Sequence, residues 1–147
     1  MRIQLSLIAG AIAIATVALG HSGATGVVKE RMDAMSSIAA NMKSVNQMLR
    51  GTADYNAEAV ATAMQAIADH AAMLPHQFPE GTDAAPSEAA PAIWTDTEGF
   101  NAIFHELEVS AAELVLVAAD QTAVQQGFRK VASTCKACHA DFRIERD

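Results

Sequence analysis

Hydrophobic periodicity is the feature of this chain that most restricts its fold. Between Val28 and Leu49, apolar side chains recur every three or four positions, which places them on one face of an α-helix. Gly51 follows this segment and can end the helix, because glycine readily takes a left-handed backbone conformation. The stripe consists of Val28, Met32, Met35, Ile38, Met42, Val45 and Leu49.

Three more segments show the same period. The second predicted helix starts near Asn56 and is stopped by Pro75, and the segment 75–93 holds all four prolines and reads as a long irregular connection. Thr95 with Glu98, and Thr122 with Gln125, are candidate capping boxes for the third and fourth helices. The three stripes are Val60, Met64, Ile67, Ala71 and Leu74; Phe100, Ile103, Phe104, Leu107, Ala111, Leu114 and Val115; and Val124, Phe128 and Val131.

Four helical segments joined by one long and two short connections predict an all-α antiparallel four-helix bundle in a single domain. The composition agrees, because 51% of the residues are hydrophobic and only 18% are charged, which argues against disorder. Aromatic residues make up only 5%, which argues against an all-β domain. The net charge of −7 gives no uniform attraction for phosphate backbones and argues against a nucleic-acid partner.

The amino-terminal segment reads as an export signal. Arg2 precedes an apolar stretch from Leu5 to Leu19, and small residues allow cleavage after Gly20 or after Ala24. A transmembrane anchor is the alternative, since the stretch approaches the length needed to cross a bilayer. No basic stop-transfer cluster follows, which favours a signal peptide over residues 1–20, or 1–24, and a periplasmic mature domain over 25–147.

The two cysteines carry the chemistry of the chain. On a helix, Cys135, Cys138 and His139 lie at positions i, i+3 and i+4, so two sulfurs and an imidazole share one face. This spacing is the signature of c-type haem attachment, with the histidine bound to the iron. A zinc site lacks further ligands at a suitable spacing, and a thioredoxin-like site lacks its βαβ context. A structural disulfide in a haem-free helical bundle stays open as an alternative.

The motif lies at the end of the chain, and this position limits the sixth iron ligand. None of the residues from Ala140 to Asp147 is Met, His, Lys or Cys. A sixth ligand, where there is one, therefore comes from earlier in the sequence.

With these motifs the sequence resembles cytochrome c′, the class II cytochromes c, over residues 27–147. The likeness is carried by VKERMDAM at 28–35, LPHQFPEGT at 74–82, PAIW at 91–94 and CKACHADFR at 135–143. It implies a periplasmic four-helix bundle with one covalent haem c near the last helix, which binds nitric oxide or carbon monoxide and takes part in electron transfer. It also implies a homodimer, for which the Ala-rich first and second helices offer surfaces. No paired carboxylates and no nucleophile with a base stand beside the haem motif in the sequence, so we expect no catalytic turnover of an organic substrate.

The resemblance also assigns site residues. It implies that Arg31 lies near a haem propionate, that Met35 faces the iron opposite His139, that Phe78 walls this distal side, and that Arg143 stands near the proximal imidazole. An exposed role for Arg31 and Arg143, and a core role for Met35, are the alternatives.

Further side chains have simpler predicted roles. His76 is a candidate distal donor or ligand, or else a loop histidine that points to water, and Trp94 is expected to pack at the junction of loop and helix. His70 and His105 are expected on the surface or the rim of the site. The remaining methionines, Met42, Met48, Met64 and Met73, are expected to fill the core.

The state of the sixth position separates two functions. An open, five-coordinate iron would bind diatomic gases, whereas Met35 sulfur as sixth ligand would make the protein a dedicated electron carrier. Because Arg31 lies one turn before Met35, as in five-coordinate members, the open site is favoured. The sequence does not identify the redox partner.

Overall fold

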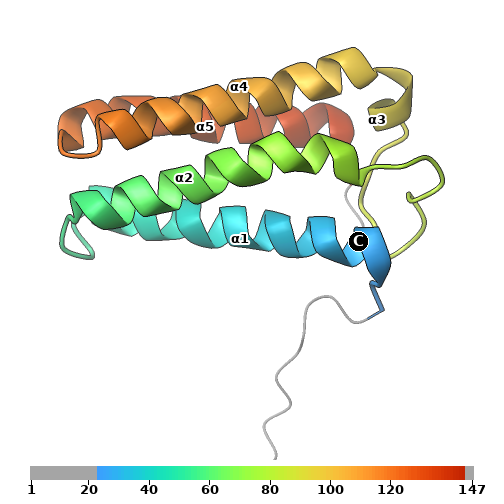
Figure 1. Cartoon of the computed structure of the whole chain (residues 1–147), viewed down its shortest axis with the longest axis horizontal. Helices are drawn as coiled ribbons and strands as arrows, with labels where there is room; N and C mark the ends of the chain where they lie inside the picture. Colours follow the sequence, from blue (N-terminus) through green and yellow to red (C-terminus); the bar gives the residue numbers. More distant parts are fainter. Residues whose placement is uncertain (1–22, 145–147) are drawn as a thin grey trace, which may run out of the picture.

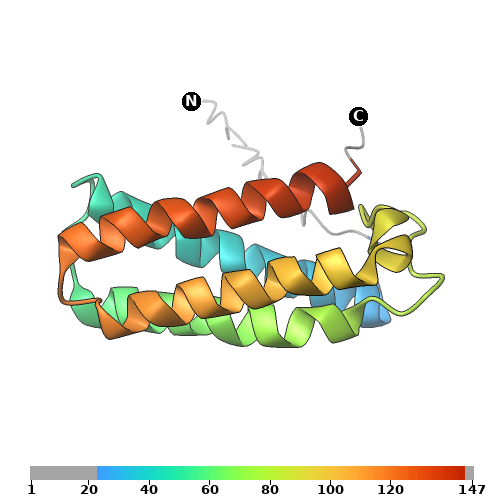
Figure 2. The ribbon, with the colours of Figure 1, turned by 90° about the horizontal axis from the view of Figure 1, so that it is seen from above.

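The computed structural model describes residues 23–144, which form a bundle of four long helices (Figures 1 and 2). Consecutive long helices run antiparallel, as the sequence predicts. Two short helices lie in the connection between the second and third long helices, and the described chain contains no strand beyond an isolated bridge between Ala89 and Arg143. The elements are α1 (Gly26–Leu49), α2 (Ala57–Met73), the 3₁₀-helix η1 (Leu74–Gln77), α3 (Ala92–Thr95), α4 (Thr97–Leu116) and α5 (Gln121–Phe142).

The predicted signal peptide at 1–20 lies outside the described residues, and only residues 23 and 24 of its longer version are described. Within residues 23–144, no helix has the length and apolar character that a membrane span requires.

The ends of α1 and α2 follow the predictions. Gly51 has φ +71°, the left-handed conformation that terminates α1. Asn56 caps α2, and its side-chain oxygen accepts a hydrogen bond from the amide of Ala59 at 2.9 Å.

The predicted caps of the last two long helices are wrong. Asp96, and not Thr95, caps α4 by accepting a hydrogen bond from the amide of Gly99 at 3.0 Å. Asp120 caps α5 and accepts from the amides of Thr122 and Ala123. Asp caps helices as well as Ser or Thr does, so the Thr-x-x-Glu and Thr-x-x-Gln patterns were not decisive.

The apolar stripes of all four long helices contribute to the core. Val60, Met64, Ile67 and Leu74 are completely buried, and phenylalanine rings from the loop, α4 and α5 pack edge to face around Phe100 with centroids about 5 Å apart. Met48 and Met64 are core residues, as predicted. Met73 is 53% exposed, so its prediction as core filler is wrong.

One side of the bundle is open. Helix α1 packs on α2, α2 on α4 and α4 on α5, but α1 and α5 make no comparable contact with each other. The stripe of α1 accordingly stays partly uncovered, and Met32, Met35 and Met42 are only half-buried. This seam between α1 and α5 contains the candidate site.

Candidate functional site

A cavity of about 630 Å³ lies in the seam between α1 and α5. Its size falls within the range of about 300–1,000 Å³ that is usual for ligand and cofactor sites. Its walls are largely apolar and come from α1, the loop before α3, α4 and α5. The residues that matter for its chemistry are Arg31, Met32, Met35, Met42, Phe78, Ser87, Glu88, Phe100, Cys135, Cys138, His139 and Arg143.

The α5 wall presents both thiols and the imidazole on one face, as the sequence predicts. Cys135 and Cys138 are half-buried, and no disulfide joins them. Burial raises the pKa of both thiols, that of Cys138 to about 11, with additional contributions from Cys135 and Asp141. The thiols are therefore neutral at ordinary pH. Residues 23–144 hold no cluster of three or more His, Cys, Asp or Glu suited to a metal ion, which argues against a zinc site.

His139 faces the cavity in a neutral form. Partial burial and the charge of Arg143 lower its pKa, while Glu88 opposes the shift. An unprotonated imidazole is the form that binds a metal. His139 is thus the side chain of α5 best suited to coordinate iron.

Three methionines lie on the α1 wall of the cavity, together with Ile38 and Ala39. Met35 lies on it, where the resemblance implies, and Met32 and Met42 line the same cavity. Met42 was predicted as core filler and Met32 as part of the apolar stripe. Apolar periodicity predicts that a side chain is buried, but it does not show whether that side chain packs in the core or lines a cavity.

Arg31 is buried, with only 3% of its surface exposed, so the exposed alternative is wrong. Its Nη1 donates to the carbonyl of Gln77 at 3.3 Å and to Oγ1 of Thr82 at 2.7 Å. Its Nη2 donates to Oγ of Ser87 at 2.6 Å and to the carbonyl of Thr82. Burial lowers its pKa, and Asp83 opposes this. All four terminal N–H groups therefore hold the loop after α2, and a role toward a haem propionate stays a prediction.

Phe78 lies on the cavity wall beneath this arginine. The Arg31 guanidinium carbon lies 4.6 Å from the centroid of its ring, and the ring packs on Phe100. The carbonyl of Phe78 accepts a hydrogen bond from the indole nitrogen of Trp94 at 2.9 Å. Trp94 thus packs at the junction of loop and helix, as predicted.

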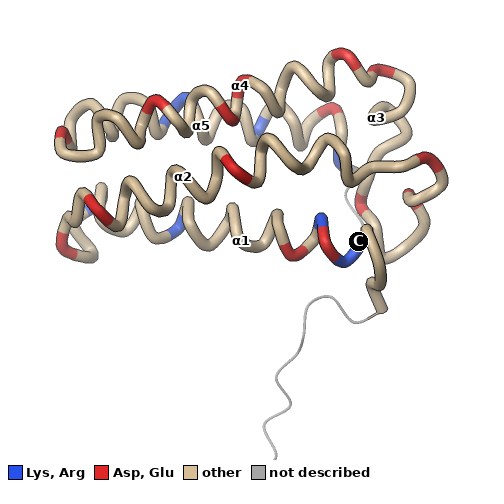
Figure 3. Tube along the Cα trace, in the orientation of Figure 1, with Lys and Arg blue, Asp and Glu red and all other residues tan. Residues whose placement is uncertain are grey.

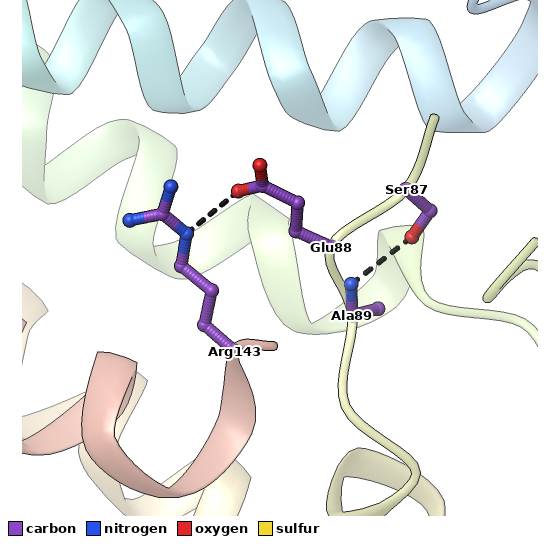
Figure 4. A network of polar contacts seen from close by, with 4 residues as sticks. All are labelled: Ser87, Glu88, Ala89 and Arg143. Carbon is purple, nitrogen blue, oxygen red and sulfur yellow. Dashed lines mark hydrogen bonds and ion pairs between the residues drawn. The ribbon is translucent and has the colours of Figure 1, made fainter. Parts of the chain in front are cut away.

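Arg143 at the end of α5 forms an ion pair with Glu88, with Nε and Oε2 2.7 Å apart (Figure 4). Next to it, the amide of Ala90 donates to the carbonyl of Phe142, and the amide of Ile144 donates to the carbonyl of Glu88. Ser87 Oγ accepts from the amide of Ala89 at 3.1 Å. Sequence reasoning missed Glu88, because a single acid in a proline-rich loop carries no periodic signal.

The other histidines do not line this cavity. His76 and His105 line a second, smaller cavity of about 300 Å³ on the α2 and α4 side. His105 is exposed and lies 3.6 Å from Glu108, as a surface residue would. His70 is half-buried, and its Nδ1 has no hydrogen-bond partner in the described part of the chain.

The cavity fits a covalently attached haem. The cavity is large and mostly apolar, and the two thiols and the imidazole lie on one of its walls. The seam between α1 and α5, which do not pack on each other, gives a flat group access to it. Cys135 and Cys138 would hold the group, and His139 would bind its iron. Among the described side chains that line the cavity, the only other good iron ligands are methionine sulfurs.

Comparison with known proteins gives consistent matches. The family model for cytochrome c′ matches residues 26–143. Cytochrome c-556 of Agrobacterium tumefaciens is 33% identical over 122 residues, which cover 82% of this chain and 99% of the relative. Cytochrome c′ of Rhodopseudomonas palustris is 28% identical over 148 residues, which cover 99% of each.

Solved structures give the same result. Cytochrome c′ from Rhodopseudomonas palustris superposes with a TM-score of 0.79 at 28% identity, covering 84% of this chain and all of the other. Cytochrome c′ from Shewanella frigidimarina superposes with a TM-score of 0.75 at 26% identity, covering 81% of this chain and 94% of the other. With its bundle, its haem-attachment motif and a family match over most of its length, this chain belongs to the cytochrome c′ family and binds a covalent haem c with iron.

Proposed function

We propose that this protein is an exported c-type cytochrome that binds nitric oxide or carbon monoxide at an open iron and takes part in one-electron transfer. In this proposal Cys135 and Cys138 form the two thioether bonds, and His139 is the proximal iron ligand. The observation that supports it best is the cavity itself, with His139 on one wall and apolar side chains on the wall across from it.

A bound haem would supply a one-electron iron couple and an iron able to bind a small ligand. The side chains of the chain set the conditions for both. Met35, Phe78 and Phe100 would give the distal wall a largely apolar surface toward an approaching gas, beside the buried guanidinium of Arg31. Arg31 keeps Phe78 in place through the loop, and Arg143 with Glu88 sets the charge beside His139.

A dedicated electron carrier is the second candidate function. Met35 lies on the cavity wall, so its sulfur is the best placed candidate for a sixth ligand. A thioether bound opposite His139 raises the reduction potential and closes the iron to gases. We favour the open site, because Met35 shares this wall with Met32 and Met42 in one apolar row. In such a row, packing alone accounts for the position of Met35 without coordination to the iron.

An optical experiment separates the two functions. For an open site, we expect the ferrous protein to show a broad, unsplit visible band and rapid binding of carbon monoxide, and Met35→Ala to leave the band shape unchanged. Met42→Ala is the matched control, because it shortens a methionine of the same cavity wall. Sharp α and β bands that disappear in Met35→Ala but persist in Met42→Ala would establish the Met-ligated carrier instead.

We propose binding and electron transfer, without turnover of an organic substrate. Glu88 is the only carboxylate among the described residues that line the cavity, so this wall offers no pair of carboxylates for acid–base catalysis. Saturable turnover of an organic substrate at several per second would contradict this part of the proposal.

Export is the last part of the proposal. We expect protein purified from the periplasm of a bacterium with haem-attachment machinery to have the intact mass of the chain without residues 1–20, or 1–24, plus one haem. Mass spectrometry of the purified protein measures this. A membrane-bound product that retains Met1–Gly20 would show that the segment is an anchor.

A further inference from the structure

The charges of the described chain are divided between two sides of the bundle (Figure 3). Helices α2 and α4 carry six acidic residues and no lysine or arginine. Helices α1 and α5, with the residues that directly follow them, carry eight basic and three acidic residues. The protein is acidic as a whole, but the side that contains the seam is basic. The eight bases are Lys29, Arg31, Lys43, Arg50, Arg129, Lys130, Lys136 and Arg143.

Five of these bases are spaced by seven residues along the two helices that border the cavity. Arg50 follows Lys43 by seven residues, and Arg129, Lys136 and Arg143 form a second row with the same spacing. On an α-helix this spacing keeps side chains on one face, with a drift of only about 20° per step. All five are exposed. We call these five residues the basic seam.

Both rows reach the lining of the cavity, through Lys43 on α1 and through Lys136 and Arg143 on α5. Lys136 follows Ala132 by four residues and precedes His139 by three, and both of these residues line the cavity. Lys43 follows Ala39, another lining residue, by four. Cations of both rows therefore border the cavity.

Acidic side chains of the described residues neutralise little of the positive charge of the basic seam. In the part of the chain that the structure describes, ion pairs involve only Lys29 with Asp33, His105 with Glu108 and Arg143 with Glu88. Lys43, Arg50, Arg129 and Lys136 form none. Exposed cations that have no ion-pair partner among residues 23–144 are available to a partner from outside.

We propose that the basic seam is the docking surface for a one-electron redox protein whose own surface is rich in carboxylates. This inference rests on the proposed electron-transfer function and adds the site and chemistry of the encounter. In the docked complex one electron passes between the haem iron and the partner's redox centre, so one is oxidised as the other is reduced. Complementary charge would accelerate the encounter and orient the cavity mouth toward the partner.

The same observations disfavour two other occupants. The large exposed apolar side chains of residues 23–144, Met73, Val109, Leu116 and Val117, all belong to α2, to α4 or to the residue that follows α4. The basic seam thus has no apolar side chain to insert into a lipid surface. A second copy could offer its acidic α2 and α4 side, but such a head-to-tail contact does not close into a dimer.

The sign of the salt dependence tests the proposal. Ferrous protein gives one electron to ferricyanide, which becomes ferrocyanide, and stopped-flow spectroscopy measures the second-order rate constant. We expect this constant to fall by about tenfold between about 0.01 M and 0.1 M salt, where the Debye length shortens from about 30 Å to 10 Å. With the cationic oxidant tris(phenanthroline)cobalt(III) it should rise. A protein that reacts through an acidic surface would give the opposite signs, which overturns the proposal.

Two charge reversals on one helix locate the effect. Lys136→Glu lies in the basic seam. Lys130→Glu makes the same change in net charge outside the basic seam. It lies three residues after Gly127, whose backbone faces Leu114 of α4. We expect Lys136→Glu to slow the ferricyanide reaction at low salt by about fivefold or more, and Lys130→Glu to change it by less than about twofold. Equal effects of the two variants overturn the assignment. An unchanged ferrous spectrum confirms that each variant keeps its haem site.

A surface of carboxylates tests docking directly. On a gold electrode coated with carboxylate-terminated alkanethiols, we expect the holoprotein to adsorb and exchange electrons despite its net charge of −7, and Lys43→Glu with Lys136→Glu to prevent this. Three outcomes would each overturn the proposed partner. The first is preference for a trimethylammonium-coated electrode, and the second is binding to phosphatidylglycerol vesicles that persists in the double variant. The third is the formation of salt-sensitive chains of copies, seen in sedimentation. Absence of electron exchange with either reagent and either electrode would overturn the proposed function as well, which separates the two failures.

Discussion

The variant that combines Cys135→Ala and Cys138→Ala is expected to carry no haem through denaturing electrophoresis, whereas the unchanged protein keeps its haem in the same gel. The reason is that these thiols stand together on the cavity wall and are not joined to each other. Peroxidase staining of the gel measures the attached haem. We also expect the free energy of unfolding to fall by about 4 kcal/mol or more, as for the loss of a ligand bound far above its dissociation constant.

The fold explains why the effect on stability is large. Three sides of the bundle are closed by helix packing, but the α1 and α5 side is completed only by what fills the cavity. Without the haem, an apolar cavity of about 630 Å³ stands open to water or collapses. Ala137→Ser is the matched control, because it alters an exposed residue between the two cysteines. Haem that survives denaturation in the double variant, or an unchanged unfolding transition, would show that this motif does not attach the group.

The fold was predictable from the sequence because the bundle is built from local signals. The period of the stripes defined each long helix, and Gly51 and Asn56 defined two of the ends. The caps of α4 and α5 were missed because several polar residues compete at each helix start, and only the backbone geometry selects Asp96 and Asp120.

The candidate site was predictable only in part. Cys135, Cys138 and His139 could be found because their relation lies within one helix. Met42 and Glu88 could not, because their place on the cavity wall depends on how α1 and the proline-rich loop lie against α5. No single apolar stripe predicts the open seam either, since the apolar face of α1 has the same sequence pattern whether it packs on a helix or borders a cavity.

The contacts of Arg31 could not be predicted from the sequence either, and they lead to a second prediction with a large expected effect. The resemblance implied its position beside the haem, but its partners lie in the loop, 46 to 56 residues further along the chain. The buried guanidinium joins Gln77, Thr82 and Ser87, while the indole of Trp94 holds the neighbouring carbonyl of Phe78. The part of the cavity wall that Phe78 forms is therefore held by Arg31 of α1 together with Trp94 of α3.

We expect Arg31→Ala to lower the free energy of unfolding by about 3 kcal/mol, because it removes the charge-assisted hydrogen bonds of a buried guanidinium, including those to the carbonyls of Gln77 and Thr82. Arg31→Lys should recover only part of this, because an ammonium group cannot reproduce the two-pronged geometry of a guanidinium. Urea unfolding of the haem-containing protein, followed by circular dichroism, measures both changes.

The matched control for Arg31 is Lys29→Ala, which removes a base two residues earlier in the same helix. Lys29 pairs with Asp33 on the surface, where its side chain is 55% exposed, so we expect a loss below about 0.5 kcal/mol. Fluorescence of Trp94, the only tryptophan, reports on the loop, and it should rise in Arg31→Ala if the loop moves away from a quenching haem. Equal unfolding free energies for Arg31→Ala and Lys29→Ala, with unchanged fluorescence, would show that the loop keeps its place without the arginine.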